Sequence, residues 1–170
     1  MRNISLIALD VDGTLTDGKI YYDNNGNEMK AFNAKDGMAI AQAGKNGLYT
    51  AIVTGRKSEI VEKRGQELGV KYIVQGAHNK LIVIDNIVKE LGINRENVLF
   101  IGDDINDLEV MRSVGLSGCP KDAVEEVLNI SDFIASVNGG DGAVREIIEA
   151  ILKSQGLWNK IVNNYKGVTQ

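Results

Sequence analysis

The chain has 170 residues, of which 44% are hydrophobic, and its formal net charge is −4 at pH 7. A chain of this length predicts one domain, residues 1–170, with a sizeable core. The negative charge and the absence of long Lys/Arg runs exclude nucleic acid as a natural partner. No apolar run approaches the roughly 20 residues that cross a bilayer, which excludes a membrane span. The single cysteine, Cys119, cannot form an internal disulfide, so we expect a cytoplasmic protein.

Short β-branched or leucine-rich runs alternate with longer amphipathic segments. The expected strands cover residues 4–10, 48–54, 71–75, 97–103, 115–119 and 132–136. The expected helices cover residues 37–46, 57–68, 79–91, 105–114, 123–128 and 143–153. Repeated strand and helix units imply parallel strands joined by crossover helices. The predicted fold class is therefore α/β, with a doubly wound, Rossmann-like parallel sheet.

One segment after the first strand interrupts this alternation. Residues 19–23 and 28–33 are β-like and flank an Asn-Asn-Gly-Asn sequence at 24–27, whose residues tolerate positive φ. The segment predicts a β-hairpin insertion at about residues 18–34. Its apolar side chains are Ile20, Tyr21, Tyr22, Met29 and Phe32. Because an isolated two-stranded ribbon is marginal in water, we expect the hairpin to pack on something, with another subunit as a candidate.

Polar side chains follow the ends of several predicted strands. They are Asp10, Asp12, Thr54, Gln75, Asp103 and Asp104, joined by Lys80 at the start of the helix after the third strand. Ligands of an open parallel sheet bind beyond the carboxyl ends of its strands, so these side chains should share one edge. Carboxylates brought together repel one another unless a hard cation neutralises them, and oxygen ligands suit magnesium. The sequence therefore predicts a Mg²⁺ site there.

DVDGT at 10–14, VTGR at 53–56, Lys80 and GDDINDLEVM at 102–111 together resemble the haloacid dehalogenase superfamily. The resemblance implies a phosphomonoesterase in which Asp10 attacks phosphorus and Asp12 is the general acid and base. Thr54 would then hydrogen-bond the phosphoryl group, and Lys80 would neutralise its charge. The implied metal ligands are Asp10, Asp12 and Asp103, with Asp104 and Asp107 in support. Asp104 has an alternative role, because it could instead cap the helix that begins near residue 105.

The resemblance extends over nearly the whole chain to the capless phosphatases of 3-deoxy-D-manno-octulosonate (KDO) 8-phosphate, which act in lipopolysaccharide precursor synthesis. It is carried by segments such as DVDGTLTDGKIYYDNNGNEMKAFNAKDG, TGRKSEIVEKRGQELGV and GGDGAVREIIEAILKSQG. It implies a homotetramer in which the hairpins form a central barrel and a neighbouring subunit helps to close each site. It also implies that the C-terminal tail, about residues 156–170, reaches a partner's site; disorder of the tail is the alternative.

The same resemblance implies a set of substrate contacts. They are Asp12, Asn33, Ala34, Lys35, Asp36, Gly37, Arg56, Arg64 and Lys80. Arg56 favours an eight-carbon substrate, because relatives that act on nine-carbon sugars tend to place an acidic residue after the TG. Lys35, however, stands where the subfamily often has arginine, and lysine does not bind a carboxylate bidentately. A 9-phosphate of a nine-carbon keto-sugar acid, 2-keto-3-deoxynonulosonate or N-acylneuraminate, is therefore an alternative substrate.

The sequence is also compatible with a function of a different class. Similar domains occur fused to cytidylyltransferases, and the chain could be a noncatalytic partner domain of that kind. A purely structural domain would not need the complete set of acids, so the acids favour the enzyme. Two residues are expected to take no part in the chemistry: His78, which precedes a helix and has no place in the implied mechanism, and Cys119, which is expected to be buried and inert.

Overall fold

A parallel sheet forms the centre of the protein in a computed structural model that describes residues 3–167. The strands are β1 (Leu6–Leu9), β4 (Tyr49–Thr54), β5 (Tyr72–Gln75), β6 (Val98–Ile101), β7 (Leu116–Cys119) and β8 (Phe133–Ile134). They pair in the order β5-β4-β1-β6-β7-β8, all in parallel. The predicted doubly wound α/β fold is confirmed. The chain leaves β1 towards β4 and β5 and returns beside β1 as β6, which places the topological switch point at β1.

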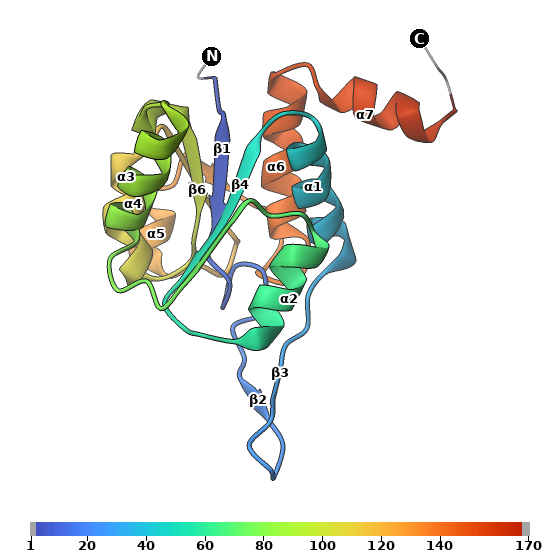
Figure 1. The fold of residues 1–170 in the computed structure, drawn as a ribbon. Coiled ribbons are helices and arrows are strands. Elements are labelled where there is room, and N and C mark those ends of the chain that lie inside the picture. The colour runs from blue at the N-terminus through green and yellow to red at the C-terminus, as the bar shows by residue number, and fades with distance from the viewer. Residues whose placement is uncertain (1–2, 168–170) are drawn as a thin grey trace.

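Helices cover both faces of the sheet (Figure 1). α3 (Lys80–Leu91), α4 (Leu108–Ser113) and α5 (Glu125–Leu128) lie on one face. α1 (Ala34–Lys45), α2 (Glu59–Glu67) and α6 (Ala143–Ser154) lie on the other, and α7 (Trp158–Tyr165) follows α6. Successive β1 side chains enter opposite clusters: Leu6 packs on the α3 side and Ile7 on the α6 side. The strands are therefore buried on both faces, as their unbroken apolar sequences predict.

Several helix boundaries differ from the sequence prediction. α1 begins at Ala34, earlier than predicted, because the Asn33 side chain accepts a hydrogen bond from the Lys35 backbone N at 2.8 Å and caps the helix. The helix predicted over 105–114 divides into a 3₁₀ turn, η2 (Ile105–Asp107), and α4, and a further 3₁₀ turn, η1 (Arg95–Asn97), precedes β6. Much of the predicted tail is the amphipathic helix α7, whose Ile161 is buried; residues 168–170 lie outside the described part.

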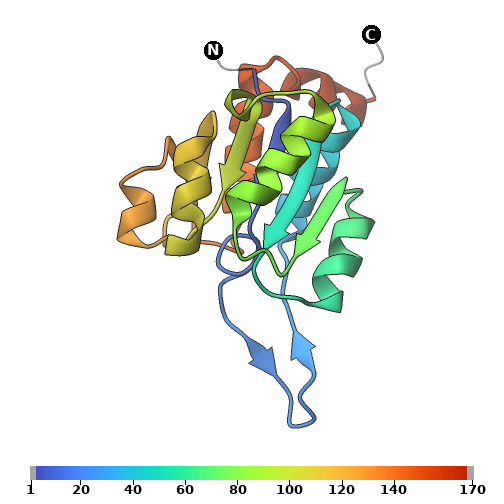
Figure 2. The same ribbon diagram turned by 60° about the vertical axis from the view of Figure 1, so that its left-hand side comes forward.

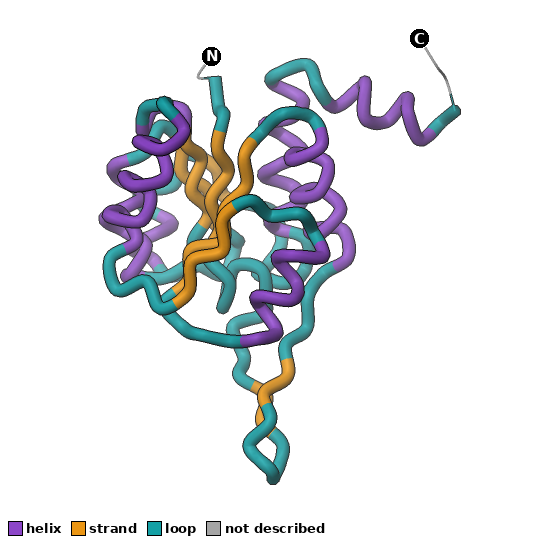
Figure 3. The backbone as a smooth tube through the Cα atoms, in the orientation of Figure 1, coloured by secondary structure: helices purple, strands orange, loops and turns teal. Residues whose placement is uncertain are grey.

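The hairpin projects beyond the carboxyl ends of the strands, away from the helical layers (Figures 2 and 3). Its strands β2 (Tyr21–Tyr22) and β3 (Glu28–Met29) are antiparallel and shorter than predicted. Asp23 fixes the turn by accepting hydrogen bonds from two backbone N–H groups. Within the turn at residues 24–27, Gly26 has a positive φ of +81°. Within residues 3–167, no helix is long and apolar enough to span a membrane.

The packing of α6 on the sheet gives a test of the core. Ile147 is fully buried and lies against Gly118 of β7, where an added Cβ would come within 3.1 Å of the Ile147 side chain. Ile147→Ala should lower the free energy of unfolding by about 2–5 kcal/mol, because it leaves a cavity. Ile82→Ala, on the exposed face of α3, should change it by only ~0.5 kcal/mol. Urea unfolding at one protein concentration measures both; equal losses would contradict this packing.

Candidate active site

A buried lysine lies between two carboxylates at the carboxyl edge of the sheet. Lys80 Nζ is 2.8 Å from Asp10 Oδ2 and 2.6 Å from Asp107 Oδ1. All three residues are buried. Asp10 directly follows β1, and its backbone N donates to the Ile101 carbonyl of β6 at 2.9 Å. The Asn79 cap fixes the start of α3 and thereby the position of Lys80. The two ion pairs offset the large free-energy cost of burying the Lys80 ammonium group.

Asp107 also holds the loop that follows β6. Its Oδ2 accepts hydrogen bonds from the backbone N of Asp103 at 3.1 Å and of Asp104 at 3.4 Å. The loop passes so closely that a Cβ on Gly102 would come within 2.5 Å of Asp107. Asp104 instead turns its side chain to the Ile105 backbone N at 2.7 Å and caps η2. Of the two acids predicted to support the metal, the structure places Asp107 in the buried cluster and Asp104 at the cap.

Three carboxylates converge beside Lys80. One oxygen each from Asp10, Asp103 and Asp107 lies within 4.8 Å of the others. Thr14 Oγ1 donates to Asp103 Oδ1 at 2.8 Å. Gly13 is required opposite Asp103, because its φ is +87° and a Cβ there would come within 2.0 Å of the Asp103 carboxylate. The loops after β1 and β6 therefore fix the acids against each other.

This arrangement makes ionisation costly. Burial raises the pKa of Asp10 to about 6, which the adjacent positive charge of Lys80 only partly offsets. Burial likewise raises the pKa of Asp103 to about 7; the Thr14 hydrogen bond opposes the rise, and the negative charge of Asp10 adds to it. A cation bound by the three carboxylate oxygens would offset the cost of burying their charges and the repulsion between them. An all-oxygen donor set fits a hard divalent ion such as Mg²⁺.

An open cleft lies above the acids. It is lined by Asp10, Asp12, Thr54, Gly55, Arg56, Asp104 and Asn106. The structure thus brings together the acids, hydroxyl and arginine predicted from three separate strand ends. Asn106 was not predicted; it lies within the GDDINDLEVM motif, but an asparagine in a helix-starting turn carries no signal of its own. His78 is exposed in the loop before α3, and Cys119 is buried in the core, as expected.

A chain of ion pairs leads from Asp12 into the hairpin. Lys30 Nζ donates to Asp12 Oδ1 and lies 3.2 Å from Glu28 Oε1. The same Glu28 oxygen accepts from Arg56 at 3.0 Å, and Arg56 also donates to the Tyr22 hydroxyl at 3.0 Å. Lys30 was missed by the sequence prediction. The available signal was the spacing of Glu28 and Lys30, two residues apart on an expected strand and so on one face.

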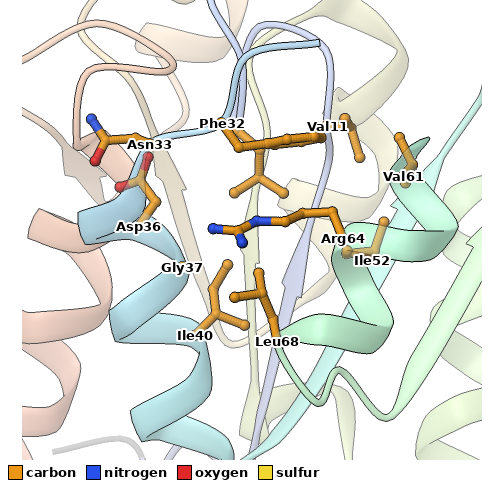
Figure 4. A pocket seen from close by; sticks show the side chains of 11 residues that line it. Val11, Phe32, Asn33, Asp36, Gly37, Ile40, Ile52, Val61, Arg64 and Leu68 are labelled. Carbon is orange, nitrogen blue, oxygen red and sulfur yellow. The ribbon is translucent and has the colours of Figure 1, made fainter. Parts of the chain in front are cut away.

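The remaining predicted substrate contacts do not line this cleft. Figure 4 shows the Arg64 side chain in a narrow pocket between Phe32 and Leu68, with its guanidinium directed towards Gly37. A Cβ on Gly37 would come within 2.4 Å of Arg64, so the glycine makes room for the guanidinium. Arg64 lies on α2, whereas Arg56 precedes that helix, so the two arginines do not lie on one helix face.

The turn at residues 33–37 is tied to the start of α6. Asp36, almost fully buried, accepts from the Arg145 backbone N at 2.7 Å, and Asn33 donates to the Gly140 carbonyl at 3.1 Å. Burial raises the pKa of Asp36 to about 6. Ala34 and Lys35 are exposed. Within one chain, the residues of this turn do not line the cleft above Asp10.

The fold and the acid cluster define a class of hydrolase. A parallel α/β sheet with DVDGT after β1 and GDD after β6 has the arrangement of a haloacid dehalogenase-like hydrolase, and the model of that family matches residues 7–78 and 69–147. The chain belongs to the haloacid dehalogenase-like hydrolase family.

More specific similarities lie within that family. The chain is 46% identical over 155 residues to 3-deoxy-D-manno-octulosonate 8-phosphate phosphatase of Escherichia coli K12, covering 91% of this chain and 82% of that protein. The Moraxella catarrhalis phosphatase of the same name, in complex with magnesium, phosphate and KDO, superposes with a TM-score of 0.94 at 39% identity, over 96% and 94% of the two chains. The cobalt-bound Haemophilus influenzae phosphatase superposes with a TM-score of 0.88 at 36% identity, over 92% of each chain.

The raised carboxyl pKa values predict how stability depends on pH and metal. Asp10 and Asp103 titrate higher in the folded protein than in the unfolded chain, where an aspartate pKa is about 3.9. The folded metal-free protein therefore holds extra protons at mildly acidic pH, and its stability should fall as pH rises from about 4 to about 7. Mg²⁺ binds the ionised form, so it should raise the melting temperature more at about pH 8 than at about pH 5.5.

Asp103→Asn is the matched control for this experiment. It removes one charge from the cluster, so it should reduce both the pH-dependent loss of stability and the stabilisation by Mg²⁺. A melting temperature of the wild-type protein that responds equally to Mg²⁺ at both pH values would contradict a metal site built on these carboxylates.

Proposed function

We propose that this chain is a magnesium-dependent phosphatase that hydrolyses KDO 8-phosphate to KDO and phosphate through a phosphorylated Asp10. The observation that carries the proposal is the buried cluster of Asp10, Lys80 and Asp107 beside Asp103, at the switch point of the sheet. The named activities of the similar phosphatases support the substrate. A noncatalytic domain would gain nothing from burying these charges together.

The proposed reaction has two steps, both centred on Asp10. An Asp10 carboxylate oxygen attacks phosphorus while the sugar alkoxide leaves with a proton from Asp12. Water then attacks the phosphoryl group, its proton passes to Asp12, and the Asp10 carboxylate is regenerated. Lys80, 2.8 Å from Asp10, keeps the nucleophile ionised. Thr54, at the end of β4 in the same cleft, is the proposed hydrogen-bond donor to the phosphoryl group.

The proposed Mg²⁺ would be held by Asp10, Asp103 and Asp107, whose oxygens converge. When bound, it supplies positive charge next to the phosphoryl oxygens, where negative charge gathers during transfer. Asp12, the other ligand proposed from the sequence, lines the same cleft, and its carboxylate pairs with Lys30. The Asp104 carboxylate caps η2.

The substrate carboxylate is the proposed partner of Arg56, which stands at the rim of the cleft. The other predicted contacts, from Asn33 to Gly37, lie away from the cleft of their own chain. We propose that they act in a homotetramer, in which a neighbour's exposed Lys35 reaches each cleft and the apolar hairpins associate. The exposed Tyr22 and Met29 support such an association. Each subunit would be one phosphatase domain, and the proposed compartment is the cytoplasm.

A second substrate class follows from one observation. Lys35 is exposed, and its ammonium group binds a carboxylate as a point charge. An arginine at this position could bind the carboxylate bidentately and would select it more strictly. A 9-phosphate of a nine-carbon keto-sugar acid is therefore the alternative substrate.

Replacement of the nucleophile tests the reaction. Asp10→Asn should lower phosphate release from KDO 8-phosphate by on the order of 10⁴-fold or more, because the amide cannot form the covalent intermediate. The circular dichroism spectrum should remain that of the folded protein. Turnover close to the wild-type rate in a folded Asp10→Asn variant would refute this role of Asp10.

Substrate choice is tested with eight-carbon and nine-carbon keto-sugar acid phosphates, each with and without Mg²⁺. KDO 8-phosphate should give the higher kcat/KM, and turnover should require the metal. Preference for the nine-carbon substrate would establish the alternative, and preference for simple aryl phosphates over both would exclude a sugar-acid substrate. Lack of Mg²⁺-dependent turnover with every phosphate would favour a noncatalytic domain.

Arg56→Lys tests carboxylate recognition separately. It keeps the charge but loses the bidentate contact, so KM for KDO 8-phosphate should rise about 10-fold while kinetics with p-nitrophenyl phosphate stay unchanged. Arg112→Lys, at an exposed position on α4, is the control and should behave as wild type. An equal effect of Arg56→Lys on both substrates would contradict a carboxylate contact.

A further inference from the structure

Lys30 is buried on an otherwise exposed ribbon. Its side chain is 2% exposed, whereas Tyr22 and Met29 of the same hairpin are 61% and 58% exposed. Withdrawing an ammonium group from water is costly unless ion pairs and hydrogen bonds replace the lost hydration. Lys30 obtains both from two carboxylates, Asp12 on the β1 loop and Glu28 on β3. The hairpin therefore buries this cation against the loop that follows β1.

The orientation of the Asp12 carboxylate is tied to its contact with Lys30. Among residues 3–167, Lys30 is the one side chain that donates a hydrogen bond to it. Asp12 follows the end of β1 and lines an open cleft, so its carboxylate has solvent on one side and Lys30 on the other. A group that transfers a proton must lie within hydrogen-bond reach of the leaving oxygen, and small displacements reduce the rate strongly.

We infer that Lys30 is a positioning residue that orients the Asp12 carboxylate for proton transfer. The inference rests on the proposed function of Asp12 as general acid and base. Glu28 completes the arrangement, because its carboxylate contacts both Lys30 and Arg56. The proton-transfer group and the proposed carboxylate-binding arginine are thus linked through one hairpin of the same chain, and a displacement of the hairpin would disturb both.

Leaving-group dependence tests this role. A sugar alkoxide must be protonated as it leaves, whereas p-nitrophenolate leaves without a proton. If Lys30 acts through Asp12, Lys30→Met should lower kcat for KDO 8-phosphate at least about 10-fold more than for p-nitrophenyl phosphate, whereas a loss through Arg56 would raise KM instead. Lys30→Arg keeps the cation and should recover most of the loss. Lys19→Met, on the same hairpin with a side chain 72% exposed, should leave both values unchanged.

Equal losses of kcat on the two substrates, a higher KM for KDO 8-phosphate with kcat unchanged, or no loss on either substrate would overturn the role of Lys30. If Lys30→Met does not fold, Lys30→Gln takes its place and the same ratio of losses is decisive. Failure of the proposed substrate is a separate result: if the wild-type enzyme does not hydrolyse KDO 8-phosphate, an alkyl phosphate that it does accept replaces it. The comparison with p-nitrophenyl phosphate then still decides the role of Lys30.

Discussion

The burial of Lys80 between Asp10 and Asp107 is the interaction on which the rest of the site depends. The ammonium group is hidden from water, so it requires both carboxylates, and both carboxylates require a cation. Asp107 in turn holds the loop after β6 through two backbone N–H groups, which sets the position of Asp103. One charge cluster therefore fixes the proposed nucleophile Asp10, the loop after β6 and the proposed metal ligands together. It leaves Asp103 with a raised pKa that a metal would lower.

A second set of ion pairs joins this rigid centre to the projecting hairpin. Lys30 pairs with Asp12 in the cleft and with Glu28 on the hairpin, and Glu28 pairs with Arg56. The cleft itself is open, and residues 33–37 of the same chain do not line it. The acids and Lys80 proposed for the chemistry therefore lie together in one chain, whereas several of the proposed substrate contacts do not line its cleft.

The sequence predicted what depends on local patterns. Apolar runs located the six strands of the sheet, and their order along the chain placed Asp10, Thr54 and Asp103 at one edge. It could not predict contacts that depend on side-chain direction. Asp104 and Asp107 look equivalent in GDDINDLEVM, yet the split between η2 and α4 sends one to a cap and the other into the core. The position of Lys30 depends on the tertiary contact between the hairpin and the loop after β1.

In the proposed reaction the phosphoryl group is transferred to Asp10 before water removes it, and rapid-quench mass spectrometry can detect that intermediate. Enzyme mixed with KDO 8-phosphate and Mg²⁺ should, when quenched in acid within one turnover, carry one phosphoryl group on the peptide that contains Asp10. The group should disappear as free phosphate appears, and it should be absent without Mg²⁺. Complete turnover with no phosphoryl group on Asp10 at any quench time, or with the group on another residue, would contradict the account.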